Sequence, residues 1–263
     1  MTSTGRLCIS SVLWSGFVIL VLAFMLLPIV VVIIFSFGSN PHASAPMGPL
    51  TLKWYIALFN RPDFPSALEN SAIITGSIGA LSAVVGTAAG FALARMPQHR
   101  AGRLLTLLTL PIAMPPLVLA LALAVGYSAL GIQLGLYTVI AGQLVFTQPF
   151  VVLVVYAQMA DFDAGILESA RDLGASRFTV FKTIILPMIR PVIIGATLIA
   201  MSVSLDDFII TFFTIGGGLT LPTMIWGMLR TSLDPSVNAL GSLVLAATMG
   251  ASMVALRLTN YRG

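Results

Sequence analysis

The chain contains stretches without Asp, Glu, Lys or Arg that are too long for the core of a soluble domain. The longest, Leu104 to Ala160, runs for 57 residues. A helix needs about 20 apolar residues to cross a bilayer core, so this stretch is long enough for two crossings and must fold back on itself. Gly126, Gly131 and Gly135 mark the turn. Only 8% of the chain is charged, against roughly 25% in a soluble domain, which predicts an integral membrane protein.

The other apolar stretches predict further spans and an all-α, polytopic membrane protein with six transmembrane helices in one domain, 1–263. Arg6 precedes the first span, as in a signal peptide, but the apolar run is too long and lacks a small-residue cleavage site, so we expect it to be retained. Pro111, Pro115 and Pro116 predict a kink or broken turn in the third span. The expected spans are 12–37, 70–94, 104–128, 137–158, 191–213 and 235–256.

The distribution of basic residues predicts the orientation. Six crossings place both termini on one side, and ten of the 13 Lys and Arg residues lie on that side. Cytoplasmic loops carry the excess of such residues, so both termini are expected in the cytoplasm. The ten are Arg6, Arg95, Arg100, Arg103, Arg171, Arg177, Lys182, Arg190, Arg257 and Arg262, against Lys53, Arg61 and Arg230 outside.

The predicted cytoplasmic loop 159–190 is a charged island, with four acids and four bases. Its pattern predicts two short helices. Asp163 can cap the first and Gly174 can end it, while Ser176 can cap the second and Pro187 can stop it. Helices this short are not stable alone, so their apolar stripes need a partner surface. The stripes are Ile166, Ala170 and Leu173, then Phe178, Phe181 and Ile185.

Seven residues of this island stand at a fixed spacing: Glu168, Ser169, Ala170, Gly174, Ile184, Leu186 and Pro187. Their spacing resembles the EAA motif of permease subunits of bacterial ABC importers. Ser169 replaces the usual first Ala of that motif. The resemblance implies a coupling helix that docks into a groove of an ATPase subunit. An ordinary solvated loop is the alternative, and a DNA-binding helix-turn-helix is disfavoured because the island has no net charge.

The segments SLDDFIITFF, LPTMIWGMLR and DPSVNAL extend the resemblance to the second permease subunit of spermidine/putrescine-type importers. This implies a type I permease fold in the bacterial inner membrane, a second permease subunit, a dimer of ATPase subunits and a solute-binding protein outside. Such members can carry an acid after the Pro of the third span, where this chain has Pro115 and Pro116. Similar permeases carry opines, amino-acid-like compounds, ferric iron or thiamine.

The chain lacks the residues of an ATPase or another enzyme. Neither Lys53 nor Lys182 follows a phosphate-binding loop, so ATP and Mg²⁺ are expected on a partner chain and no cofactor on this one. His42 and His99 fall in predicted loops, which leaves no catalytic or metal-binding cluster in the membrane. A secondary transporter or channel is the rival function, but no inverted repeat is evident.

Asp206 and Asp207 are candidates for the substrate pathway. They follow Pro191 by about 15 residues, which places them about 22 Å along the span and in the outer half of the membrane. A carboxylate there is costly unless it faces a polar pathway. The alternatives are a wet bend at the helix end or a pair with a base on a neighbouring subunit. Trp54 is expected to anchor its segment at the membrane surface. A contact with the substrate is the second interpretation.

Overall fold

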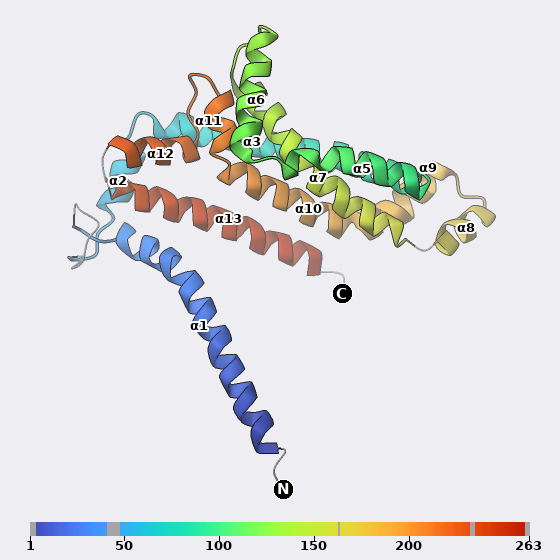
Figure 1. The fold of residues 1–263 in the computed structure, drawn as a ribbon, viewed down its shortest axis with the longest axis horizontal. Coiled ribbons are helices and arrows are strands. Elements are labelled where there is room, and N and C mark those ends of the chain that lie inside the picture. Colours follow the sequence, from blue (N-terminus) through green and yellow to red (C-terminus); the bar gives the residue numbers. More distant parts are fainter. Residues whose placement is uncertain (1–3, 41–47, 163, 232–234, 261–263) are drawn as a thin grey trace. The chain divides into compact units, whose positions relative to one another are not determined.

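The computed structural model describes residues 4–40, 48–162, 164–231 and 235–260. These residues form helices joined by short connections, and their one β feature is a bridge between Gly38 and Leu50. The all-helical prediction is therefore confirmed (Figure 1). The chain divides into two compact units, residues 1–61 with 225–246, and residues 62–224 with 247–263.

The smaller unit holds α1 (Thr4–Ser36) and α2 (Lys53–Phe59), with parts of α12 (Leu221–Thr231) and α13 (Ser236–Asn260). The apolar part of α1 is Leu13–Ser36. Its most apolar stretch has a mean hydropathy of 3.4, and no residue of that stretch is buried. So large an apolar surface is unfavourable in water, so lipid or another apolar surface must cover this helix. The Tyr55 hydroxyl hydrogen-bonds Ser36 at 2.7 Å and so ties α2 to the end of α1.

The larger unit contains the remaining helices. Two of its long helices include a π-helical turn, η1 in the first and η2 in the second. In order, its elements are α3 (Phe64–Leu81), η1 (Ser82–Gly86), α4 (Thr87–Ala94), α5 (Gln98–Ala113), α6 (Pro116–Ala129), α7 (Leu136–Ala160), α8 (Ala164–Asp172), α9 (Arg177–Val180), η2 (Phe181–Ile185), α10 (Leu186–Asp206) and α11 (Ile209–Thr214).

Helix α7 lies at the centre of this unit and packs against α3, η1, α4 and α10. Glycines let the backbones approach closely, as is common between membrane helices. A Cβ at Gly86 would lie 2.6 Å from Val151, and one at Gly90 would lie 2.8 Å from Val155. The buried core is aliphatic: Ile74, Ile78, Val139, Val151, Val155, Ala196, Ala200 and Ile215.

The predicted third span is a sharply bent pair of helices. Helices α5 and α6 meet at an angle of 98°. Pro115 has an extended backbone and precedes Pro116, the first residue of α6. Neither proline has an N–H to donate and both restrict the preceding residue, so the helix breaks between Ala113 and Pro116. The prediction of a kink or broken turn is confirmed.

The helix at the predicted fifth span, 191–213, begins before that span and ends inside it. A helix runs without a break from Arg177 to Asp206, and Pro187 lies near the start of α10 instead of ending a helix. The expectation that Pro187 stops the second short helix is wrong. The π-helical turn η2 widens the helix just before the prolyl ring, with the Leu186 N–H bonded to the Phe181 carbonyl five residues back, so the ring is accommodated.

The number and limits of the six predicted spans stay a prediction. Four helices among the described residues are long and apolar enough to cross a membrane by themselves: Leu13–Ser36, Phe64–Ala94, Leu136–Ala160 and Arg177–Asp206. The bent pair α5 and α6 makes a fifth span if counted as one, and Ser236–Gly250 is a shorter apolar helix.

Candidate functional site

The end of α10 is a break in a membrane helix, and both candidate acids lie there. Helix α10 ends at Asp206, Asp207 is extended, and α11 begins at Ile209. The Asp207 carboxylate accepts hydrogen bonds from the first turn of α11. Its Oδ2 receives the Thr211 N–H at 2.9 Å and the Thr211 hydroxyl at 3.0 Å, and its Oδ1 receives the Ile210 N–H at 3.4 Å. Asp207 therefore satisfies backbone groups that the break leaves open.

A buried glutamine from α7 reaches the same break. Gln143 is 2% exposed, and its Nε2 lies 2.9 Å from Thr211 Oγ1, 3.1 Å from Asp207 Oδ2 and 3.4 Å from the Ser204 carbonyl. Its Oε1 accepts the Ser204 hydroxyl at 2.5 Å. Gln143 was not among the site residues predicted from sequence. A polar amide inside the apolar run 137–158 is a signal that could have indicated it.

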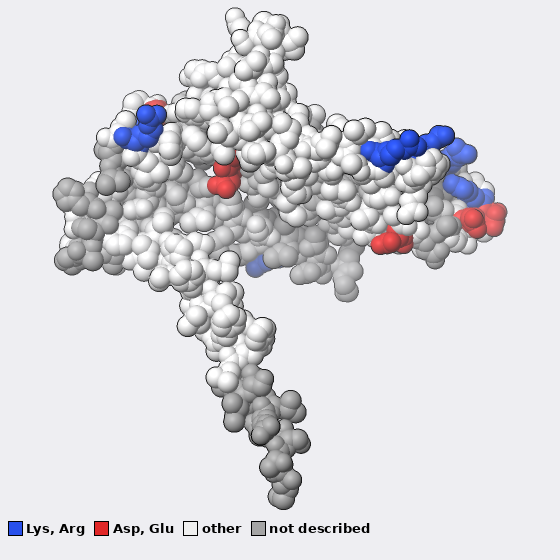
Figure 2. Space-filling view, viewed as in Figure 1, with Lys and Arg blue, Asp and Glu red and all other residues white. Residues whose placement is uncertain are grey.

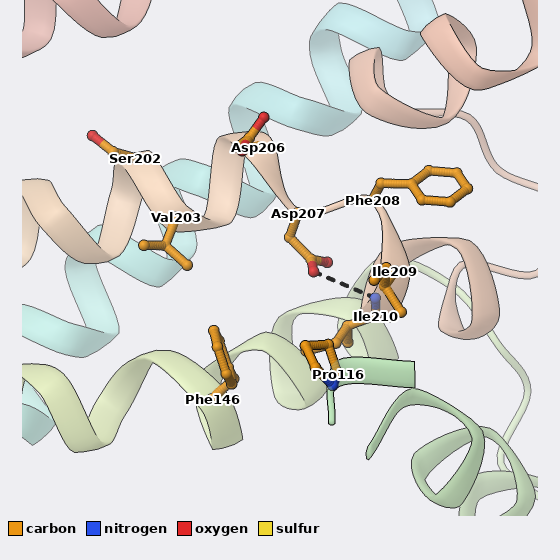
Figure 3. A pocket seen from close by; sticks show the side chains of 9 residues that line it. All are labelled: Pro116, Phe146, Ser202, Val203, Asp206, Asp207, Phe208, Ile209 and Ile210. Atoms are coloured by element: carbon orange, nitrogen blue, oxygen red, sulfur yellow. Dashed lines mark hydrogen bonds between the residues drawn. The ribbon is translucent and has the colours of Figure 1, made fainter. Parts of the chain in front are cut away.

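Asp206 has a different environment from its neighbour. Its side chain is exposed and makes no hydrogen bond or ion pair with any residue that the structure describes. Figure 3 shows the Asp206 and Asp207 side chains pointing in opposite directions from the end of α10. In Figure 2 an isolated acidic patch lies where α10 meets α11, surrounded by uncharged surface.

Both acids line a cavity of about 620 Å³. Its wall is mostly apolar and draws on four helices and the break itself (Figure 3). Pro116 comes from the bent pair and Phe146 from α7, so the 98° bend and the broken helix border one space. The other lining residues are Ser202, Val203, Phe208, Ile209 and Ile210.

Trp54, the third candidate, belongs to the smaller unit. Its indole N–H donates to the Gly38 carbonyl at 2.6 Å, and the Lys53 ammonium lies 4.4 Å from the ring centroid. These contacts hold the ring against the residues that follow α1. A substrate contact by Trp54 stays a prediction.

The charged island has the predicted break between its two helices. Gly174 has φ of +84°, the left-handed conformation that glycine adopts without steric cost. The Gly174 N–H bonds the Arg171 carbonyl at 2.8 Å and the Ala175 N–H bonds the Ala170 carbonyl at 3.0 Å, which closes the end of α8. Ser176 accepts the Thr179 N–H at 3.1 Å and so caps α9. Asp163, the predicted cap of the first helix, lies outside the described residues.

The EAA-like residues divide into an inner and an outer set. Ala170 is buried and packs with Val180, Ile185 and Ile189, while Ile184, Leu186 and Pro187 are half-buried in the helix below. Glu168, Ser169 and Gly174 are exposed. The predicted apolar stripes also divide, because Leu173 is 89% and Phe178 is 72% exposed. These two side chains form the apolar part of the outer surface.

Charged residues gather at this end of the larger unit. Figure 2 shows basic side chains over the start of α5 and near α9, with acidic ones over α8. The Arg95 guanidinium lies 4.0 Å from the Phe91 ring, which stacks edge-on against Phe181 of η2. The loop is thus packed against the end of α4.

No group of three or more His, Cys, Asp or Glu side chains that could hold a metal ion occurs among the described residues.

Comparison with known proteins identifies relatives over nearly the whole chain. The chain is 31% identical to the spermidine/putrescine transport system permease protein PotC of Escherichia coli, covering 92% of this chain and 91% of the relative. It is 33% identical to the putrescine transport system permease protein PotI of Escherichia coli, covering 88% and 85%.

The fold has solved counterparts. A subunit of a bacterial transporter that imports the polysaccharide alginate superposes with a TM-score of 0.74 at 16% identity, over 97% of this chain and 98% of that one. A chain of the MetNI methionine ABC transporter gives 0.61 at 17% identity, over 73% and 93%. Residues 84–261 match the model of the binding-protein-dependent transport system inner membrane component. The chain therefore belongs to the family of inner-membrane permease components of binding-protein-dependent ABC importers.

Proposed function

We propose that this permease carries a small organic cation of the polyamine class into the cell. The observation that carries the proposal is the Asp206 carboxylate, which has no partner among the described residues and borders a mostly apolar cavity. Two relatives at 31% and 33% identity are permeases named for spermidine and putrescine.

The chemistry of the cavity fits this class of solute. A polyamine is a chain of methylene groups between ammonium groups. A carboxylate near mid-membrane costs around 2.5 to 3.5 kcal/mol on insertion scales, so an ammonium beside Asp206 would offset part of that cost. Phe146, Phe208 and Ile209 offer apolar surface for the methylene groups. Asp206 is the primary candidate for the cation contact, with Asp207 and Trp54 as further members of the pathway.

We further propose that the loop 159–190 couples the permease to a separate ATPase, which binds ATP and Mg²⁺. Glu168, Ser169, Gly174, Leu173 and Phe178 would form the docking surface. Ala170, Ile184, Leu186 and Pro187 would join it to the span. A continuous helix of 30 residues, about 45 Å at roughly 1.5 Å per residue, links this loop to Asp206.

In this mechanism, closure of the ATPase dimer moves the docked loop and rocks the spans between inward-open and outward-open states. A solute-binding protein delivers the cation from outside, and a second permease subunit completes the pathway. The exposed apolar surface of α1 is consistent with a lipid or subunit contact.

The test is uptake by the whole complex in proteoliposomes, with labelled putrescine, spermidine and, for comparison, ferric iron and thiamine. The proposal predicts ATP-dependent uptake of at least one polyamine and copurification of an ATPase. Uptake of iron or thiamine with no uptake of either polyamine would move the substrate to another class, and uptake without an ATPase would support a secondary transporter.

A further inference from the structure

A buried side chain from α7 bridges the break between α10 and α11, and a second, Thr138, donates to the Thr214 carbonyl at the far end of α11 at 2.7 Å. Gln143 bonds Ser204 in the last turn of α10, Asp207 in the break and Thr211 in the first turn of α11. We call these four residues the clasp. Ser204, Asp207 and Thr211 lie 61 to 68 positions from Gln143 in the chain, so the clasp is a tertiary contact and not a local cap.

The hydrogen bonds of the clasp leave little capacity for a ligand. Asp207 accepts four donors, and three of them bond Oδ2. An ionised carboxylate has about four lone-pair sites, so those of Asp207 are largely used within the protein. Asp206 accepts none from the described residues. The two acids therefore have different roles although they are adjacent in sequence.

The clasp also fixes where Asp206 lies. Asp206 is the last residue of α10, between Ser204 and Asp207, which Gln143 holds. Phe208, Ile209 and Ile210 follow directly and line the same cavity. Because the helix is interrupted at this point, backbone hydrogen bonds alone do not set the direction of α11. The buried Gln143 amide adds to that direction, since leaving it unbonded would be costly.

We propose that Gln143 and Asp207 are positioning residues, which hold the ends of the broken helix so that Asp206 stays at the border of the cavity, where it meets the cation. This inference rests on the proposed function of Asp206, and it assigns Asp207 a role in holding the site and not in binding the solute. None of the hydrogen bonds that Gln143 makes within the described residues goes to Asp206, so its effect on transport must pass through the geometry of the break.

The experiment is a double-mutant cycle on the whole complex, with putrescine uptake divided by the amount of assembled complex. Losing the buried amide in Gln143→Leu should slow uptake about tenfold, the size expected when bonded polar partners are left unpaired. In an Asp206→Asn background the same change should cost less than about twofold, because Gln143 would act through Asp206. Thr147→Val is the matched control, since the one partner of the buried Thr147 hydroxyl among the described residues is the Gln143 backbone carbonyl, at 2.9 Å.

A second readout needs no solute. In a chain with Cys8→Ser and Ile209→Cys, a thiol reagent should label position 209 several-fold faster when Gln143→Leu is present, and at an unchanged rate with Thr147→Val. If Gln143→Leu does not assemble, Ser204→Ala removes one bond of the clasp and takes its place. Swapping the groups, in Gln143→Glu with Asp207→Asn, should restore part of the uptake that Gln143→Glu loses.

The outcomes separate the two proposals. An equal loss of uptake in both backgrounds, or an unchanged labelling rate, would overturn the positioning role. If the wild-type complex carries no polyamine, the proposed function fails, and the labelling rates alone then decide whether the clasp holds the break.

Discussion

Substitution of Leu173 separates an effect on docking to the ATPase from an effect on the stability of the permease. Its side chain is 89% exposed, and its backbone N–H bonds the Ser169 carbonyl at 3.2 Å. Leu173→Ser should therefore leave the stability of the permease within about 0.5 kcal/mol, as for other surface substitutions. If the side chain is buried in an ATPase groove, its burial contributes about 1.5 to 3 kcal/mol, so the ATPase should bind about 10 to 100 times more weakly.

The assay is the dissociation constant between detergent-solubilised permease complex and the ATPase that copurifies with the wild type. Leu50→Ser is the matched control, because Leu50 is also highly exposed but lies in the loop that is predicted to face outside. An unchanged dissociation constant for Leu173→Ser, or an equal loss for the control, would refute the docking role of this surface.

Three further predictions test the loop, the topology and the core. Gly174→Leu should strain a backbone held at φ +84° by about 1 kcal/mol; it should insert normally and lose transport, and normal transport would contradict the need for this left-handed turn. Tags after Thr4 and Tyr261 should resist an external protease while a tag near Ser44 is cleaved; cleavage at either terminus would reverse the orientation. Gly90→Leu should overpack the contact of α4 with α7 and cost about 1 to 3 kcal/mol, seen as a lower melting temperature, and an unchanged melting temperature would contradict that packing.

Local patterns predicted those parts of the fold that depend on local physics. Charge-free length indicated the spans, and the missing N–H groups of Pro115 and Pro116 indicated the bend. The left-handed turn at Gly174 followed from its place after a short amphipathic helix. Each of these features depends on a few neighbouring residues.

The features that local patterns did not predict depend on the surrounding structure and on contacts between distant segments. Pro187 was expected to stop a helix, and only the π-helical turn before it explains why the helix continues. The sequence likewise left Asp206 and Asp207 equivalent. Asp207 differs because it accepts hydrogen bonds from Ile210 and Thr211 and also from Gln143, which lies 64 positions away. No local pattern indicates the pairing with Gln143.

The most direct test of the account is the uptake of putrescine by complexes that carry Asp206→Asn, Asp206→Glu or Asp207→Asn, at matched amounts of assembled complex. A contact between Asp206 and an ammonium group predicts a loss of at least about tenfold for Asp206→Asn, the scale of a charge-assisted hydrogen bond. It also predicts partial activity for Asp206→Glu, which keeps the charge. Asp207→Asn should retain most of the uptake, because the Asn oxygen can still accept the Thr211 N–H, the shorter of the two N–H bonds from α11. Unchanged uptake in Asp206→Asn, with loss confined to Asp207→Asn, would contradict the account.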